Sequence, residues 1–248
     1  MDVVNGLGAA AVFFTLAFVG IFRPKQFREV VQQVYYIGAK SSGIVMLVGL
    51  FTGMVLGLQL YYTLAKFGSS GVLGSVVALS LIRELGPVLT AIMITARAGS
   101  AMTAEIGILR ISEQLDALYT MRIDPLEYIV SPRIAAALIG FPLLTAFFDL
   151  IGILGGYLTG VVLLGVDKGA YFYRIQAYVD MSDIRGGFIK ALVFSVITAT
   201  TCCYKGYFAH LGGESFGAKS VSVATTSAVV LSCVMILVSD YVVTSLLM

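Results

Sequence analysis

The segment LIRELGPVLTAIMITARAG, residues 81–99, decides the fold class, because it has the apolar character of a membrane span and yet carries Arg83 and Glu84 side by side. A charge at the centre of a bilayer costs about 2.5–3.5 kcal/mol on insertion scales, so such residues normally face a bundle interior or a wet cavity. Neighbouring residues of a helix point about 100° apart, which predicts a separate partner for each charge. Pro87 cannot donate to the carbonyl of Arg83, so a polar, bendable site is expected at this level.

The composition of the whole chain agrees with a membrane protein. Of its 248 residues 58% are hydrophobic and 12% are charged, and the mean hydropathy is +0.95. Soluble domains carry about 25% charged residues, so this chain has too few polar groups to cover a surface in water. A net charge of +2 without a basic run excludes a nucleic-acid partner. The three cysteines lack the spacing of metal ligands and are expected to be small buried side chains: Cys202, Cys203 and Cys233.

Five apolar windows follow residue 40, each longer than the ~20 residues that a helix needs to cross the hydrocarbon core. They predict an all-α membrane protein with five transmembrane helices in a permease domain of residues 41–248. The windows are roughly 41–65, 71–100, 133–166, 186–209 and 220–247.

Residues 1–40 are expected to form an N-terminal interfacial or elbow helix. Their apolar run, residues 6–22, is followed and not preceded by basic residues, so it does not have the pattern of a cleaved signal peptide. At roughly 17 residues it can lie in the interface or dip into the membrane.

Basic residues between the spans predict a cytoplasmic N-terminus and a periplasmic C-terminus, since cytoplasmic loops hold the excess of Lys and Arg. One side of the predicted topology collects nine of them: Arg23, Lys25, Arg28, Lys40, Arg110, Arg122, Arg133, Lys205 and Lys219. The other side collects only Lys66, Lys168, Arg174 and Arg185.

Glycines recur at every fourth position in the first and third spans, as Gly49, Gly53, Gly57 and as Gly152, Gly156, Gly160. Such ridges let helix backbones approach closely. Packing within one subunit and an interface between subunits are both consistent with them.

Two further charges lie in apolar surroundings, Lys190 in the fourth span and Asp240 in the fifth. With the predicted topology they share the outer half of the membrane with Arg83 and Glu84, with Arg83 nearer mid-depth. This predicts a shared polar cavity, with a purely structural ion-pair network as the alternative. Asp149 is another buried charge, and the sequence indicates no partner for it.

The loop EIGILRISEQLDALYTMRIDP, residues 105–125, has apolar residues at helical spacing and predicts an amphipathic helix over about 105–122. It would either rest on the membrane surface or dock a cytoplasmic partner. Asp124, Pro125 and Glu127 fit the N-cap, N1 and N3 positions of the next helix.

Other chemistry finds no support in the residues. The segment GGESFGAKS, residues 212–220, has Ala218 before the lysine and no preceding strand, so it is not a phosphate loop. No metal site and no pair of nucleophile and base is recognisable.

The stretch from residue 78 to 136 resembles the signature region of the MlaE permeases, because RELGPV, RAGSA, TAEIG, EQLDAL and DPL occur in the order and spacing of that family. The resemblance continues through SPR, FPLLT and GGYL. It implies a homodimer in a Gram-negative inner membrane, with an MlaF-like ATPase, an MlaB-like STAS protein and an MlaD-like MCE hexamer as partners.

The resemblance also implies a function and roles for particular residues. The permease would move glycerophospholipids between the inner membrane and a periplasmic MCE carrier and so maintain outer-membrane lipid asymmetry. It would bind phospholipid as substrate and no cofactor, since ATP and Mg²⁺ belong to the ATPase. The lipid cavity would involve Arg83, Glu84, Lys190, Asp240, Gln59 and Leu56, and the ATPase-coupling segment Arg110, Glu113, Gln114, Asp116 and Leu118.

Two other functions remain as alternatives. An ion-coupled secondary transporter could use Glu84 and Asp240, although the sequence lacks an obvious inverted repeat. An intramembrane lipid-modifying enzyme would need a nucleophile and a base that the sequence does not supply.

Overall fold

The computed structural model describes residues 13, 15, 27–211 and 217–247, and in these ranges it contains helices and turns but no strand. The apolar run at residues 6–22 lies almost wholly outside the described residues. Five helical segments are long and apolar enough to cross a membrane: Arg28–Lys66, Ser70–Ile111, Leu126–Leu163, Met181–Tyr207 and Ala218–Leu247. The prediction of an all-α membrane protein with five spans is confirmed.

Three of these segments combine α-helical and wider π-helical turns. The first contains α2 (Phe27–Val34), η2 (Tyr35–Ala39) and α3 (Lys40–Lys66). The second contains η3 (Ser70–Val72), α4 (Leu73–Ser80), η4 (Leu81–Leu85), α5 (Gly86–Ile94), η5 (Thr95–Gly99) and α6 (Ser100–Ile111). The third contains η6 (Leu126–Val130), α8 (Ser131–Tyr157) and η7 (Leu158–Leu163).

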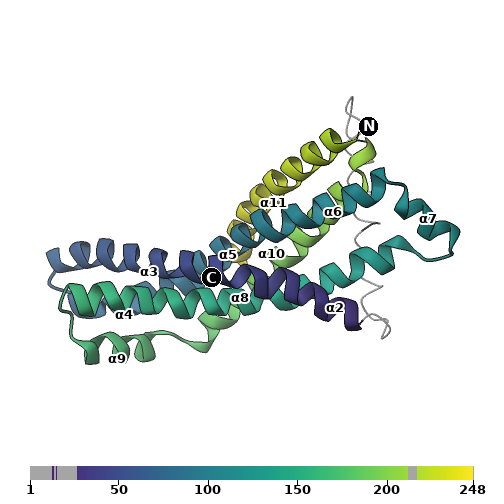
Figure 1. Ribbon diagram of the computed structural model, residues 1–248. Coiled ribbons are helices and arrows are strands. Elements are labelled where there is room, and N and C mark those ends of the chain that lie inside the picture. Colours follow the sequence, from purple (N-terminus) through teal and green to yellow (C-terminus); the bar gives the residue numbers. More distant parts are fainter. Residues whose placement is uncertain (1–12, 14, 16–26, 212–216, 248) are drawn as a thin grey trace.

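The fourth and fifth segments are the single helices α10 (Met181–Tyr207) and α11 (Ala218–Leu247), and three short helices connect the spans: α7 (Gln114–Thr120), α9 (Lys168–Tyr178) and η8 (Ala209–Leu211). The molecule is elongated, with α9 at one end and α7 at the other (Figure 1). Helix α11 ends near the middle of the long axis, so α3, α4, α8 and α9 extend past it toward the α9 end (Figure 1).

The glycine ridges pack against each other inside the chain. A Cβ atom at Gly49 would lie 2.8 Å from the carbonyl oxygen of Phe148, and one at Gly57 would lie 3.2 Å from the Cα atom of Gly156. At Gly53 an added Cβ would overlap the backbone of Gly152. The two ridges therefore hold α3 directly against α8. Of the two expectations for the glycine ridges, the structure shows packing within one subunit.

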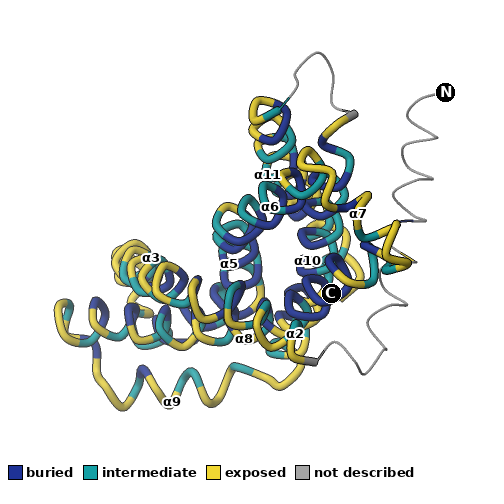
Figure 2. The backbone as a smooth tube through the Cα atoms, turned by 45° about the vertical axis from the view of Figure 1, so that its right-hand side comes forward, coloured by how far each residue is buried: buried dark blue, intermediate teal, exposed yellow. Residues whose placement is uncertain are grey.

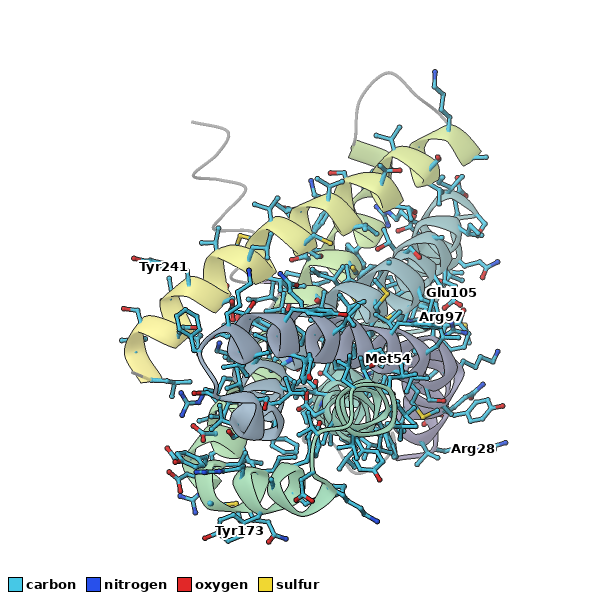
Figure 3. The ribbon with its side chains drawn as sticks, turned by 90° about the vertical axis from the view of Figure 1, so that its left-hand side faces the viewer. Arg28, Met54, Arg97, Glu105, Tyr173 and Tyr241 are labelled. Carbon is cyan, nitrogen blue, oxygen red and sulfur yellow. The ribbon has the colours of Figure 1, made fainter. Side chains whose placement is uncertain are left out.

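The buried core lies along α5, α6, α10 and the inner face of α8, whereas the outer faces of α3 and α9 are exposed (Figure 2). Large apolar side chains are exposed along α3, α8 and α11, as expected where helices meet lipid or another subunit. Tyr241 on α11 and Tyr173 on α9 both point away from the molecule (Figure 3).

The amphipathic segment at 105–122 is two helices rather than one. Residues up to Ile111 prolong the second span as α6, and the chain then turns at Glu113, whose φ is 59°. Arg110 clamps the corner by donating to Asp116 Oδ1 at 2.8 Å. The next helix starts as predicted, because Asp124 Oδ1 accepts from the backbone N–H of Leu126 and Pro125 is the first helical residue.

Candidate functional site

Arg83 and Glu84 lie in η4, a single π-helical turn within the first half of the second span. The N–H of Gly86 donates to the carbonyl of Leu81, five residues back, as the wider turn requires. Pro87 follows at once and has no N–H to donate. Wide turns of this kind occur often at functional sites, because they change the faces on which side chains emerge.

The ammonium group of Lys190 on α10 donates a hydrogen bond to the carbonyl of Arg83, to which Pro87 cannot donate. Its Nζ atom lies 2.9 Å from the carbonyl oxygen of Arg83, 2.6 Å from Glu84 Oε2 and 3.0 Å from Asp240 Oδ1. The ammonium group donates hydrogen bonds to the first two oxygens and forms an ion pair with the third. The Lys190 side chain is only 3% exposed. The carboxylates of Glu84 in the second span and Asp240 in the fifth span compensate its charge.

Arg83 reaches the first turn of α10. Its Nε and Nη2 atoms both lie 2.8 Å from Asp183 Oδ1. Asp183 Oδ2 in turn accepts from the backbone N–H of Asp180 at 3.1 Å, as part of the capping box that starts α10. On the opposite side, the Thr244 hydroxyl of α11 donates to Glu84 Oε1 at 3.2 Å. Arg83 and Glu84 thus have separate partners, as their 100° separation predicted.

These charges line a pocket of about 480 Å³ between η4, the start of α10 and the end of α11. We call it the charge pocket, and its lining residues are Arg83, Glu84, Asp180, Ser182, Asp183, Gly186, Gly187, Lys190, Thr244 and Leu247. The Arg83 guanidinium is 46% exposed, so it can still bind an anionic group that enters the pocket. The Glu84 carboxylate beside it is 39% exposed and offers an acceptor to a cationic group.

Among the partners of Arg83 and Glu84 in this site, the sequence did not single out Asp183 and Thr244. The site does not contain Gln59 or Leu56, which lie on α3: Gln59 is exposed, and Leu56 packs half-buried against the core. The structure also places Arg83 at the same level as Lys190 and Asp240, contrary to the expected difference in depth. The expected depth is counted along a predicted window of residues 71–100. The helical segment has 42 residues and continues to Ile111, so the middle of that window is not the middle of the helix.

The predicted coupling residues gather at the α7 end of the molecule. Glu113 and Asp116 are exposed, whereas Gln114 and Leu118 line a second pocket of about 350 Å³ between α2, α6, α7 and α8. Arg110 also donates through Nε to His210 Nδ1 at 3.2 Å. Burial and the adjacent guanidinium lower the pKa of His210 from its ordinary value.

Metal binding and thiol chemistry receive no support from the described part of the chain. No group of three or more His, Cys, Asp or Glu side chains lies close enough to hold a metal ion there. Cys202 and Cys203 are buried free thiols, and Cys233 is a half-buried free thiol.

Comparison with known proteins identifies the family to which these features belong. The model of the family described as "Permease MlaE" matches residues 30–246. The chain belongs to the MlaE permease family. It is therefore a multi-pass membrane protein of the ABC transporter permease class.

Individual relatives of this permease come from distant organisms. The intermembrane phospholipid transport system permease protein MlaE of Haemophilus influenzae is 41% identical over 251 residues, which cover 100% of this chain and 94% of that protein. A probable ABC transporter permease protein of Rickettsia typhi is 40% identical over 98% of this chain and 92% of its own. Protein TRIGALACTOSYLDIACYLGLYCEROL 1, chloroplastic, of Arabidopsis thaliana is 34% identical over 88% of this chain and 61% of its own.

Proposed function

We propose that this permease moves glycerophospholipids between the inner membrane and a periplasmic MCE carrier, with the charge pocket receiving the lipid headgroup. It works as a homodimer with an ATPase, a STAS protein and an MCE hexamer, and it contributes to outer-membrane lipid asymmetry. ATP is hydrolysed on the partner ATPase, and movement of the α7 end transmits that work to the pocket.

The observation that supports this proposal most strongly is the group of charges of both signs that line the charge pocket. Arg83 and Lys190 lie there with Glu84, Asp180 and Asp183, and the exposed Arg83 and Glu84 stand next to open volume. A phospholipid headgroup carries a phosphate and, in many lipids, a cationic or hydroxyl group. Side chains of both signs in one pocket are complementary to such a headgroup.

The test is ATP-dependent transfer of labelled phospholipid from proteoliposomes to the MCE carrier by the complete complex. Replacing Arg83 or Glu84 by Ala removes one charge-assisted contact worth about 1.5–3 kcal/mol, so transfer should fall at least about tenfold. Lys168 is exposed on α9 and lines none of the described pockets, and Lys168→Ala is the matched control that should transfer lipid normally. If both pocket variants transfer lipid at the wild-type rate, the charge pocket does not receive the headgroup and the proposal is refuted.

The ion-coupled alternative would use the same two carboxylates, Glu84 and Asp240. Both contact the ammonium group of Lys190, so a transported cation would first have to displace it. The purified permease in liposomes with an ion gradient and without ATPase distinguishes the two functions. Ion-driven transport under these conditions would favour the alternative, and we expect none.

A further inference from the structure

Asp149 lies away from the charge pocket, in a groove between α8 and α10 with a volume of about 210 Å³. We call it the α8–α10 groove, and it is lined by Ile82, Thr145, Ala146, Asp149, Leu150, Ile153, Ile184, Gly187 and Phe188. Thr145 and Asp149 are the only polar side chains in this lining. The Thr145 hydroxyl donates to the carbonyl of Phe141 at 2.9 Å, which leaves Asp149 as the one polar group available to a ligand.

The carboxyl group of Asp149 is not compensated within the described residues. Its Oδ1 atom is buried against the backbone of Gly86 and has no hydrogen-bond partner among them, so a ligand in the groove would meet the other carboxyl oxygen. The backbone of Gly86 provides the space for this carboxyl, since a Cβ atom at Gly86 would collide with Asp149 Oδ1. A carboxylate among apolar side chains is costly unless a cation or a hydrogen-bond donor pairs with it.

The groove lies where lipid headgroups are expected to meet the protein. Ile184, Gly187 and Phe188 belong to the first two turns of α10, which has 27 residues and is about 40 Å long. A hydrocarbon core of about 30 Å leaves about 5 Å of this helix outside at each end. Gly187, about 9 Å from the start of α10, is therefore near the boundary between headgroups and acyl chains.

We infer that the α8–α10 groove binds a membrane lipid whose headgroup carries a primary ammonium group, with that ammonium on Asp149 and an acyl chain along Leu150 and Phe188. The charge of the groove favours this occupant, because its one ionisable side chain is acidic and the rest of its lining is apolar. A primary ammonium donates N–H groups to the carboxylate, which a trimethylated headgroup cannot do.

This lipid site is distinct from the charge pocket and does not depend on the proposed transport function. Gly187 lines both, but Lys190 points to Glu84 and Asp240 on the α11 side, whereas Phe188 and Ile184 face α8. A Cβ atom at Gly187 would lie 2.5 Å from the carbonyl oxygen of Ile82. The start of α10 therefore packs tightly on η4 between the two volumes.

The test compares lipids that differ only in methylation of the headgroup amine. The full chain is placed in nanodiscs of phosphatidylethanolamine with phosphatidylglycerol, or of phosphatidylcholine with phosphatidylglycerol, and the lipids retained after extraction are counted by native mass spectrometry. We expect retention of phosphatidylethanolamine to exceed that of phosphatidylcholine by about tenfold. Equal retention of the two lipids by the wild-type protein would overturn the inference.

Variants of Asp149 test whether its carboxylate causes the preference for phosphatidylethanolamine. Asp149→Asn keeps the shape of the side chain and removes its charge, so the preference should disappear, and Asp149→Leu should act in the same way. Glu29→Gln on α2 removes a carboxylate away from the groove and should keep the preference. A preference that survives Asp149→Asn would also refute the site. ATP-dependent lipid transfer, measured separately, shows whether the transport proposal stands or fails on its own.

Discussion

Lys190 joins three spans through one ammonium group. Its Nζ atom donates to the backbone carbonyl of Arg83 and to Glu84 Oε2 and forms an ion pair with Asp240, and the side chain is almost completely buried. Burying an ammonium is costly, so its removal from these ligands should cost more than an ordinary hydrogen bond. The Lys190 hydrogen bond to the carbonyl of Arg83 also replaces the internal hydrogen bond that residue 87 would donate in a regular helix if it were not proline.

We predict that Lys190→Met destabilises the protein by about 3 kcal/mol, because it leaves Glu84 and Asp240 facing each other without a cation. The measurement is the thermal unfolding midpoint of the purified protein in detergent. The triple variant Lys190→Met, Glu84→Gln, Asp240→Asn removes all three charges and should regain much of the loss. A single variant as stable as the wild type would show that the contacts contribute nothing.

At the level of residues, sequence reasoning found the charges that stand out in apolar windows, namely Arg83, Glu84, Lys190 and Asp240. It missed Asp183 and Thr244 for a physical reason. Asp183 lies in the polar first turn of α10, where an acid costs little, and Thr244 is one of many hydroxyl side chains that bond locally within helices. The capping pattern of Asp180 and Asp183 was a signal that could have placed Asp183 on α10.

At the level of elements, the contact of α3 with α8 rests on the absence of side chains. Gly53→Ala should therefore disrupt the protein, because its Cβ would overlap the Gly152 backbone. We expect a loss of about 1–3 kcal/mol, typical of overpacking, seen as a lower thermal midpoint. Gly43→Ala is the matched control on the same helix, since nothing lies within 4 Å of an added Cβ there.

The control variant Gly43→Ala also has an expected effect on stability. Alanine has a higher helix propensity than glycine by about 1 kcal/mol, so Gly43→Ala should be neutral or slightly stabilising. Equal behaviour of the two variants would mean that α3 and α8 separate without cost, which would contradict the close backbone approach.

A second prediction at this level concerns α7 as the docking element for the ATPase. Glu113 is exposed at the corner between α6 and α7, so Glu113→Lys changes the docking surface while leaving the Arg110–Asp116 pair intact. We expect recovery of the ATPase with the affinity-purified permease to fall at least about tenfold, as for like charges placed in an interface. Lys168→Glu on α9, at the opposite end, should leave this recovery unchanged, and undiminished recovery with Glu113→Lys would refute docking at this corner.

The sequence located the five membrane helices of the described residues but not their ends. Helix α2 contains the strong helix formers Arg28, Glu29, Gln32 and Gln33, so the first helical segment starts far before the apolar window at residue 41. The break at Glu113 could not be read in advance, because a left-handed residue is usually Gly or Asn and here it is Glu. The start at Asp124 and Pro125 was predictable, because capping is a local interaction.

At the level of the whole molecule, the long helices carry α7 and α9 to opposite ends, so the two should label from opposite sides of the membrane. Met121 next to α7 and Tyr173 on α9 are 67% and 68% exposed, which makes them a matched pair for cysteine substitution. In a Cys233→Ser background, an impermeant maleimide should label Tyr173→Cys in intact spheroplasts and Met121→Cys only after permeabilisation. The reverse pattern would invert the predicted orientation.

The wide turn at Leu81–Leu85 has a consequence for how this protein tolerates changes in chain length. Deleting one residue there would let the backbone close into a regular helix, which is no less stable on its own. The wide turn takes five residues through about the rotation that four residues cover in a regular helix, so the residues on both sides of the deletion would keep their faces. A shortened chain could thus keep its five spans and their packing, while the residues of the turn itself, Arg83 and Glu84 among them, lost their places opposite Asp183 and Lys190.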